Sequence, residues 1–163
     1  MTERQIRLFG DPVLRSACDP VRIGDPRAAS LVADLLETVQ LPGRAGLAAN
    51  QIGVGMRAFS YNVDGEVGYI INPVIAELSG EPELVDEGCL SVPGFYFPRS
   101  RYPFARVTGV DLEGNPVELS GTGLMAQALQ HETDHLDGHL YIEGLEPATK
   151  KEAMRLIRLA PWY

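Results

Sequence analysis

The sequence contains few of the features that would indicate a secreted or a membrane protein. Its 163 residues include only two cysteines, Cys18 and Cys89, too few for a disulfide framework. In a cytosolic protein such a pair is reduced rather than bridged. No stretch approaches the roughly 18 apolar residues of a transmembrane helix, and residues 1–7 lack the apolar core of a signal peptide. The sequence therefore predicts a cytoplasmic protein without a membrane segment.

Positively charged residues are also few. The 14 Lys and Arg residues are outnumbered by 22 Asp and Glu residues, so the formal net charge is −8. A surface of this sign repels phosphate groups, and we do not expect direct DNA binding. The length fits one domain over residues 1–163, and we expect a monomer. A hydrophobic content of 45% is ordinary for a globular core.

Histidine is scarce as well, but its three copies, His131, His135 and His139, lie close together. The stretch Gln130–Gly138 contains the sequence HExxH in a window that reads as a helix. Residues four apart lie on the same helix face, so His131 and His135 can bind one metal ion, while the adjacent Glu132 can transfer a proton. The alternative is an ordinary solvated helix face that carries the string by chance.

A catalytic metal site of this kind usually has a third protein ligand. His139 is a poor candidate, because it would lie about 12 Å from His131 along a continuous helix and Gly138 should end that helix first. The metzincin pattern would need a histidine where Tyr141 stands. The acids that follow, Glu143 among them, lie too close for the arrangement of thermolysin-like proteases.

Cys89 is the remaining candidate for the third ligand. It lies in the segment Asp86–Gly94, whose glycines and proline predict a tight loop. A thiolate is a strong ligand for zinc or iron, and two histidines with one cysteine form a workable catalytic set. The alternative role of a lone cysteine is apolar packing, which is also what we expect for Cys18.

Three stretches together resemble the motifs of the peptide deformylase family. Gln130–Gly138 matches the third motif, QHExDHLxG, and Glu87–Ser91 matches the second, EGCLS. Gly46–Gln51 meets the first, GxGLAAxQ, except that Arg44 replaces its first glycine. The resemblance covers most of the chain. It implies an α+β fold, a single domain in which antiparallel sheets surround a central helix carrying HExxH.

The resemblance also implies a metal and a reaction. Cys89, His131 and His135 would hold one divalent ion per chain, which is commonly Fe(II) in the family, although Zn(II) or another divalent ion is an alternative. The enzyme would remove the formyl group from the N-terminal methionine of newly made polypeptides and release formate. Its substrates would thus be N-formyl-methionyl peptides.

Further residues receive roles from the resemblance. Glu132 would accept a proton from water and return it to the leaving amine. The Gln51 amide and the Leu90 N–H would stabilise the oxyanion; without the resemblance, Gln51 could equally be a surface residue of a tight loop. The expected substrate-binding residues are Gly46, Leu47, Gly88 and Leu124. Glu87 and Arg101 form a possible ion pair beside the Cys89 segment, with two separate surface charges as the alternative.

Two other functions remain open at this point. A zinc endopeptidase would use the HExxH sequence but lacks a suitable downstream ligand. A deformylase-like protein could instead bind peptides or a partner with weak or no activity, for which the Arg44 replacement is the support.

The C-terminal segment is basic in an otherwise acidic protein. Residues 147–163 predict a second helix, with Lys150, Lys151, Arg155 and Arg158 as its cations. The simplest interpretation is a solvated face. The alternative is a docking element for an anionic surface, because the C-terminal helix of some bacterial deformylases contacts the ribosome.

The rest of the pattern alternates helices and hairpins. Asp-Pro pairs predict two helix starts, an Asp-Gly pair predicts one hairpin turn, and an Asn-Pro pair predicts an interrupted strand. The corresponding segments are helices from Asp11 and Asp25, a hairpin of 56–62 with 67–76 interrupted at Asn72, an aromatic loop at Phe95–Phe97, and a hairpin over 103–120.

Overall fold

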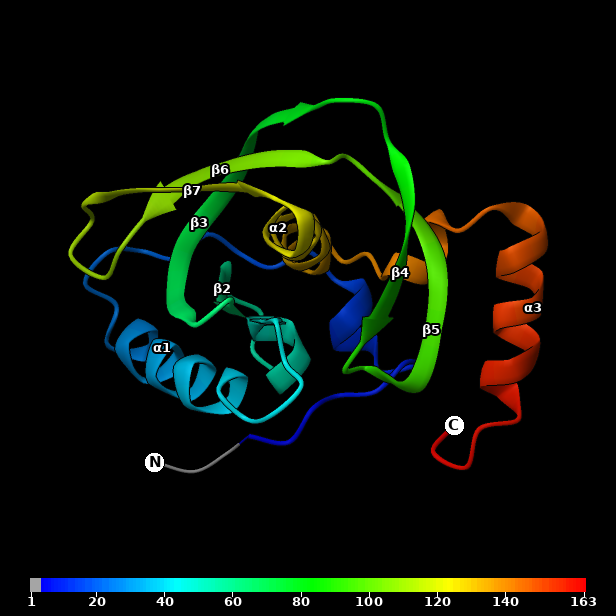
Figure 1. The fold of residues 1–163 in the computed structure, drawn as a ribbon. Helices are drawn as coiled ribbons and strands as arrows, with labels where there is room; N and C mark the ends of the chain where they lie inside the picture. Colours follow the sequence, from blue (N-terminus) through cyan, green and yellow to red (C-terminus); the bar gives the residue numbers. More distant parts are fainter. Residues whose placement is uncertain (1–3) are drawn as a thin grey trace.

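The structure is a computed structural model and describes residues 4–163. As the sequence predicts, the fold is α+β, with antiparallel sheets around a central helix (Figure 1). The larger sheet has the order β1-β2-β3-β6-β7 and the smaller one pairs β4 with β5. The strands are β1 Gly46–Ala48, β2 Ala58–Val63, β3 Glu66–Ser79, β4 Glu83–Cys89, β5 Val92–Arg101, β6 Phe104–Val110 and β7 Pro116–Thr122.

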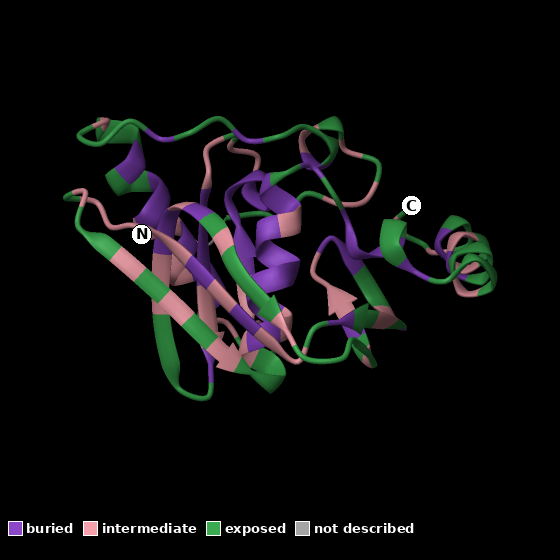
Figure 2. Ribbon diagram, turned by 90° about the horizontal axis from the view of Figure 1, so that it is seen from above, coloured by how far each residue is buried: buried purple, intermediate pink, exposed green. Residues whose placement is uncertain are grey.

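Three α-helices and three short 3-10 helices complete the fold of the described residues. Helix α2 lies at the centre, with α1 to one side and α3 beyond the β4–β5 hairpin (Figure 1). Most of α2 is buried, whereas α3 lies at the outer edge (Figure 2). The helices are α1 Pro26–Val39, α2 Gly123–Leu136, α3 Pro147–Arg158, η1 Pro12–Arg15, η2 Ala49–Ile52 and η3 Tyr141–Gly144.

The helix starts follow from local chemistry. Asp11 accepts a hydrogen bond from Val13 N at 3.0 Å, and Asp25 accepts one from Arg27 N at 2.9 Å, so each aspartate caps a helix whose first residue is proline. The first of these helices is shorter than predicted and ends at Arg15. At the other end of the chain, α3 forms as predicted but stops at Arg158, before the end of the predicted range.

The β2–β3 hairpin also forms as predicted, with positive φ angles at Asp64 and Gly65. The expected interruption at Asn72 takes the form of a register shift between Ile71 and Val74, while β3 itself continues to Ser79. The shift accommodates the proline that follows Asn72. A bulge can absorb a residue that has no N–H to donate, so the strand bends and does not end.

The segment around Cys89 differs more from its prediction. Residues 88–98 are not a loop but the turn and part of the two strands of the β4–β5 hairpin. Strand pairing here outweighs the local preference of glycine and proline for loops. The aromatic residues of this segment have different environments: Phe97 is buried in the core, while Phe95 and Tyr96 line a cleft.

The core surrounds α2. Leu129 and Leu136 are buried against Phe59, Ile70 and neighbouring residues of the large sheet. Leu124, at the start of the same helix, is not part of this core: it is 47% exposed and lines the cleft. Gly138 follows the helix with φ 85°, as expected of a helix terminator.

Cys18 is a buried packing residue, and both cysteines are free thiols. Among residues 4–163, no α-helix combines the length and the hydrophobicity that a membrane-spanning segment needs.

Candidate metal and active site

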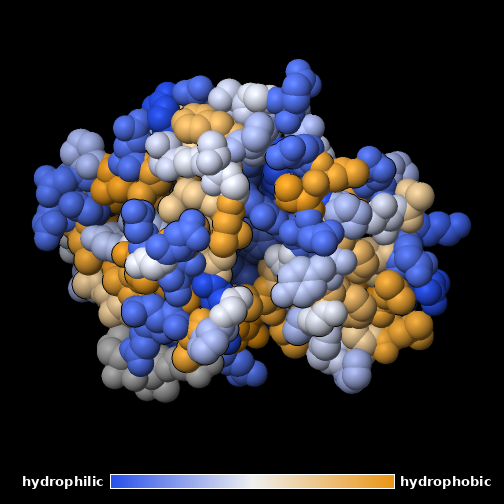
Figure 3. Space-filling view, viewed as in Figure 1, coloured by the Kyte–Doolittle hydropathy of each residue, from blue (hydrophilic) through white to orange (hydrophobic). Residues whose placement is uncertain are grey.

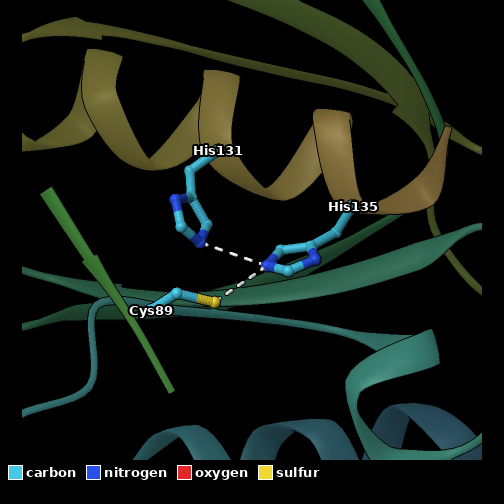
Figure 4. A group of neighbouring side chains, drawn as sticks. All are labelled: Cys89, His131 and His135. Atoms are coloured by element: carbon cyan, nitrogen blue, oxygen red, sulfur yellow. Dashed lines mark hydrogen bonds between the residues drawn. The ribbon is translucent and has the colours of Figure 1, made fainter. Parts of the chain in front are cut away.

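Two histidines of α2 and one cysteine of the β4–β5 hairpin converge on one point (Figure 4). His135 Nε2 lies 3.1 Å from His131 Nε2 and 3.3 Å from Cys89 Sγ, and all three donor atoms lie within 4.8 Å of one another. Metal–nitrogen bonds of about 2.0–2.1 Å and metal–sulfur bonds of about 2.3 Å place tetrahedral ligands at comparable separations. The three residues therefore fit one metal ion.

The charges around these donors favour a cation. Burial lowers the pKa of His135, and the nearby His131 lowers it further. Burial also opposes protonation of His131, but Glu132, Cys89 and Glu87 outweigh this effect and raise its pKa. The surrounding anions thus favour positive charge between the two imidazoles, where a divalent ion would supply it. His139 takes no part, because it is exposed beyond the helix end and faces Glu143.

Glu87 connects the metal site to a buried ion pair. Its carboxylate accepts from Arg101 Nε at 2.8 Å, as the sequence suggested, and it also lies 2.7 Å from His131 Nδ1. Burial would raise the pKa of Glu87, but the hydrogen bonds from Arg101 and His131 lower it to about 2. A charged acceptor at Nδ1 leaves His131 Nε2 facing the other two donors. No short motif indicated the contact between Glu87 and His131, or the contact between Arg101 and Asp134.

We expect Glu87→Gln and Arg101→Gln each to lower the free energy of unfolding by about 3–5 kcal/mol, since each leaves a buried charge without its partner. Both single variants should also retain metal less well than the wild type. The double variant should lose much less than the sum of the two, because the penalty is shared. Denaturant titration together with metal analysis after dialysis tests this, and full additivity would contradict it.

Glu132 is a buried carboxylate beside the three donors. Its Oε2 lies 4.0 Å from His131 Nε2, and its Oε1 has no hydrogen-bond partner among the described residues. Burial raises the pKa of Glu132 to about 7, although His131 opposes the shift. A carboxyl group with a pKa near neutrality is suited to accept and return a proton. A dication bound nearby would lower this pKa.

The close approach of Glu132 explains why residue 46 is a glycine. A methyl group added to Gly46 would lie 2.6 Å from Glu132 Oε2, which is too close for any real contact. We therefore expect Gly46→Ala to displace the carboxylate and to lower kcat by about 10²-fold, since a shift of 1 Å can cost that much. Gly55→Ala is the matched control, because nothing lies within 4 Å of the added carbon. Equal kcat values for the two variants would contradict the steric explanation.

Gln51 and Leu90, the two expected oxyanion donors, line the same cleft as Cys89. The Gln51 side chain is fully buried; its Oε1 accepts from Ala48 N at 3.0 Å, and its Nε2 donates to Ser91 Oγ at 3.1 Å and to Cys89 Sγ at 3.6 Å. This amide is thus held with its donor end toward the metal site. The Leu90 N–H has no acceptor among the turn and loop hydrogen bonds of residues 4–163.

A cleft of about 730 Å³ leads to these residues. Figure 3 shows a hollow near the middle of one face, with hydrophilic atoms at its floor. Gly46, Gly88 and Leu124 line the cleft, as does Arg44, whose guanidinium donates to Thr38 O at 3.1 Å. The expected substrate contact at Leu47 is not matched by its side chain, which is fully buried in the core beside α1.

An α+β domain with a helical HExxH sequence, a neighbouring cysteine sulfur and a cleft ending at a buried carboxylate defines a metal-dependent hydrolase. Residues 3–151 match the family model for polypeptide deformylase. The chain therefore belongs to the polypeptide deformylase family, and its function is to remove the formyl group from the N-terminal methionine of newly made polypeptides.

Individual relatives are similar over nearly the whole chain. A peptide deformylase of Acidothermus cellulolyticus is 51% identical, covering 99% of this chain and 89% of the relative. A peptide deformylase 1 of Corynebacterium efficiens is 43% identical, covering 100% and 99%. The crystal structure of a peptide deformylase from Legionella pneumophila superposes with a TM-score of 0.89 at 36% identity, covering 97% and 95%. These similarities give no support to the endopeptidase alternative.

Proposed function

We propose that Cys89, His131 and His135 hold one divalent ion, and that Glu132, Gln51 and Leu90 act on the formyl group beside it. The observation that carries this proposal is the convergence of three donor atoms within 4.8 Å beside the buried Glu132 carboxylate. When bound there, the ion would polarise a water molecule and the formyl carbonyl.

The chain's own groups then have separate tasks. Glu132 accepts the proton of the attacking water and delivers it to the amine that leaves, which becomes the free N-terminus of methionine. The Gln51 amide and the Leu90 N–H donate to the formyl oxygen as negative charge develops on it. Removing one donor of this kind typically costs about 2.7–4 kcal/mol of barrier. Formate is the second product.

The residues that line the cleft would bind the peptide. Gly46 and Gly88 have no side chains to keep the substrate backbone at a distance, and Leu124 offers an exposed apolar side chain to the methionine. Leu47 would contribute through its backbone only, because its side chain is in the core. Arg44 lies on the same wall and should affect KM more than kcat.

Formate release from formyl-Met-Ala-Ser by anaerobically purified protein tests the proposed function. The same protein is assayed on an acetylated peptide without a formyl group, where only an endopeptidase would cleave. Rapid formate release with no internal cleavage is the expected result. A metal-loaded protein that released no formate would favour the alternative of a peptide-binding protein, and Arg44→Gly would then be the first reversion to assay.

We propose that the ion is Fe(II), with Zn(II) or another divalent ion as a weaker substitute. A site with one thiolate and two imidazoles suits both metals. Fe(II) beside a thiolate reacts with oxygen, so activity should decay faster in air than under nitrogen, whereas the zinc-loaded protein should decay equally in both. Equal decay of freshly purified protein in the two atmospheres would count against iron.

We further propose that the protein is a cytoplasmic monomer and that α3 contacts the ribosome through Lys150 and Lys151. Both lysines are exposed. A deletion of this helix is a poor test, because Ala153 and Ile157 are fully buried in the core. Charge reversal at Lys150 and Lys151 leaves the core intact, and unchanged co-sedimentation with ribosomes would contradict the docking role.

A further inference from the structure

Asn50 is a buried residue for which the deformylase motif prescribes no identity, because it occupies the variable position of GxGLAAxQ. It is fully buried in η2, next to Gln51, and it does not line the substrate cleft. Its Nδ2 donates to the backbone oxygen of His135 at 2.5 Å. Asn50 therefore joins the first motif directly to a metal-binding residue 85 positions away.

The hydrogen bond from Asn50 to the His135 backbone oxygen does not by itself explain why a buried asparagine occupies this position. His135 O already accepts a hydrogen bond from Gly138 N at 3.0 Å, so this carbonyl would not be left without a partner if Asn50 were removed. Because a carbonyl can only accept, the amide nitrogen of Asn50 must face it, and this fixes Oδ1 on the other side. That Oδ1 is buried and has no hydrogen-bond partner among residues 4–163.

The His135 ring also has a buried polar atom without a hydrogen-bond partner among the described residues. Its Nε2 faces Cys89 Sγ and His131 Nε2, so Nδ1 is the nitrogen that must carry the proton when Nε2 binds a metal. This Nδ1 is also buried and has no partner among the described residues. A buried acceptor and a buried donor are thus both unpaired on two residues that already contact each other. Each would cost stability if it stayed unpaired.

We propose that Asn50 is a positioning residue for His135, and that its Oδ1 accepts the Nδ1–H of this imidazole through one buried water molecule. Buried water molecules satisfy polar groups that the protein cannot pair directly. The contact would fix the tautomer and the orientation of His135, as Glu87 does for His131 at the other imidazole. The inference rests on the proposed metal site.

The first test compares metal affinity, measured by competition between the protein and a chelator for Zn(II). Loss of an outer contact to a metal ligand typically weakens binding by about 10–100-fold, and we expect this for Asn50→Ala. Thr133→Val is the matched control, because Thr133 lies on the same helix and is buried, and its hydroxyl donates to Leu129 O at 2.8 Å. This control should bind Zn(II) like the wild type. Unchanged affinity of Asn50→Ala, or an equal loss in both variants, would overturn the proposal.

The second test does not depend on the variant folding. In the Zn(II)-loaded wild type, proton–nitrogen correlation NMR should show His135 protonated at Nδ1, with a proton that exchanges slowly with solvent. A rapidly exchanging Nδ1 proton, or the opposite tautomer, would also overturn the proposal. If the wild type bound no Zn(II) at all, the proposed metal site itself would be wrong, so the two failures are distinguishable.

Discussion

Glu132→Gln should lower the kcat for formate release by about 10²–10⁴-fold, the usual contribution of a general acid–base group. The amide has the shape of the carboxyl group but cannot accept a proton from water. The three donor atoms at the metal site are untouched, so the metal content should equal that of the wild type. Glu118→Gln is the control, because Glu118 is an exposed surface acid that pairs with Arg106. A Glu132→Gln enzyme that kept wild-type kcat would remove Glu132 from the mechanism.

Glu132→Gln should also change how the stability of the metal-free protein depends on pH. Burial raises the pKa of Glu132 from 4.5 to about 7, so its ionised form is disfavoured by folding. A carboxyl group with a raised pKa destabilises the fold increasingly as pH rises through the interval between these two values. Glu132→Gln should therefore be more stable than the wild type at pH 8, and the difference should shrink toward pH 4.5. Thermal unfolding of the metal-free proteins at the two pH values measures it.

Cys89→Ala should weaken metal binding by more than about 100-fold. Loss of a residue that only hydrogen-bonds to a metal ligand already lowers the metal affinity by about 10–100-fold, and Cys89 is itself a proposed ligand. The loss of Sγ leaves only the two imidazoles of α2, and activity should fall with metal content. The metal per chain after dialysis against a weak chelator is the direct measurement. Full occupancy at wild-type affinity would show that the thiolate is not a ligand.

Cys18→Ala is the matched control for this experiment. Cys18 is also buried, and burial raises the pKa of its thiol to about 11, so it is a poor source of thiolate. Its substitution should cost about 1 kcal/mol of stability, as core substitutions commonly do, without loss of metal. Comparing the two variants separates the loss of a ligand from the loss of a buried cysteine.

Much of this protein could be predicted from short stretches of sequence. The HExxH spacing places His131 and His135 on one helix face, because the helical repeat is fixed by the backbone. Asp25 followed by proline marks the start of α1, and Asp64-Gly65 marks the β2–β3 turn. In each case the cause and its effect lie within a few residues. The resemblance to the deformylase motifs then predicted how these separate elements combine into one α+β fold.

Local signals failed where distant segments compete with them. The glycines and proline around Cys89 indicated a loop, yet the pairing of Glu83 with Arg101 and of the residues between them makes the segment a hairpin. Asn72 and the proline after it indicated an interruption of the strand, but the structure confines it to a register shift, because β6 continues to pair with β3 beyond Asn72. Ladder hydrogen bonds and burial on a long strand outweigh the preferences of single residues.

The helix with its two imidazoles, the carboxylate beside them and the family motifs could all be recognised from the residues alone. Four contacts became visible only in the folded chain: Cys89 Sγ at 3.3 Å from His135, the Glu87 carboxylate on His131, Gly46 against Glu132, and Asn50 on the His135 backbone. These contacts join residues tens of positions apart. Their geometry depends on how the sheet, the hairpin and α2 pack against one another, which no short stretch of sequence specifies.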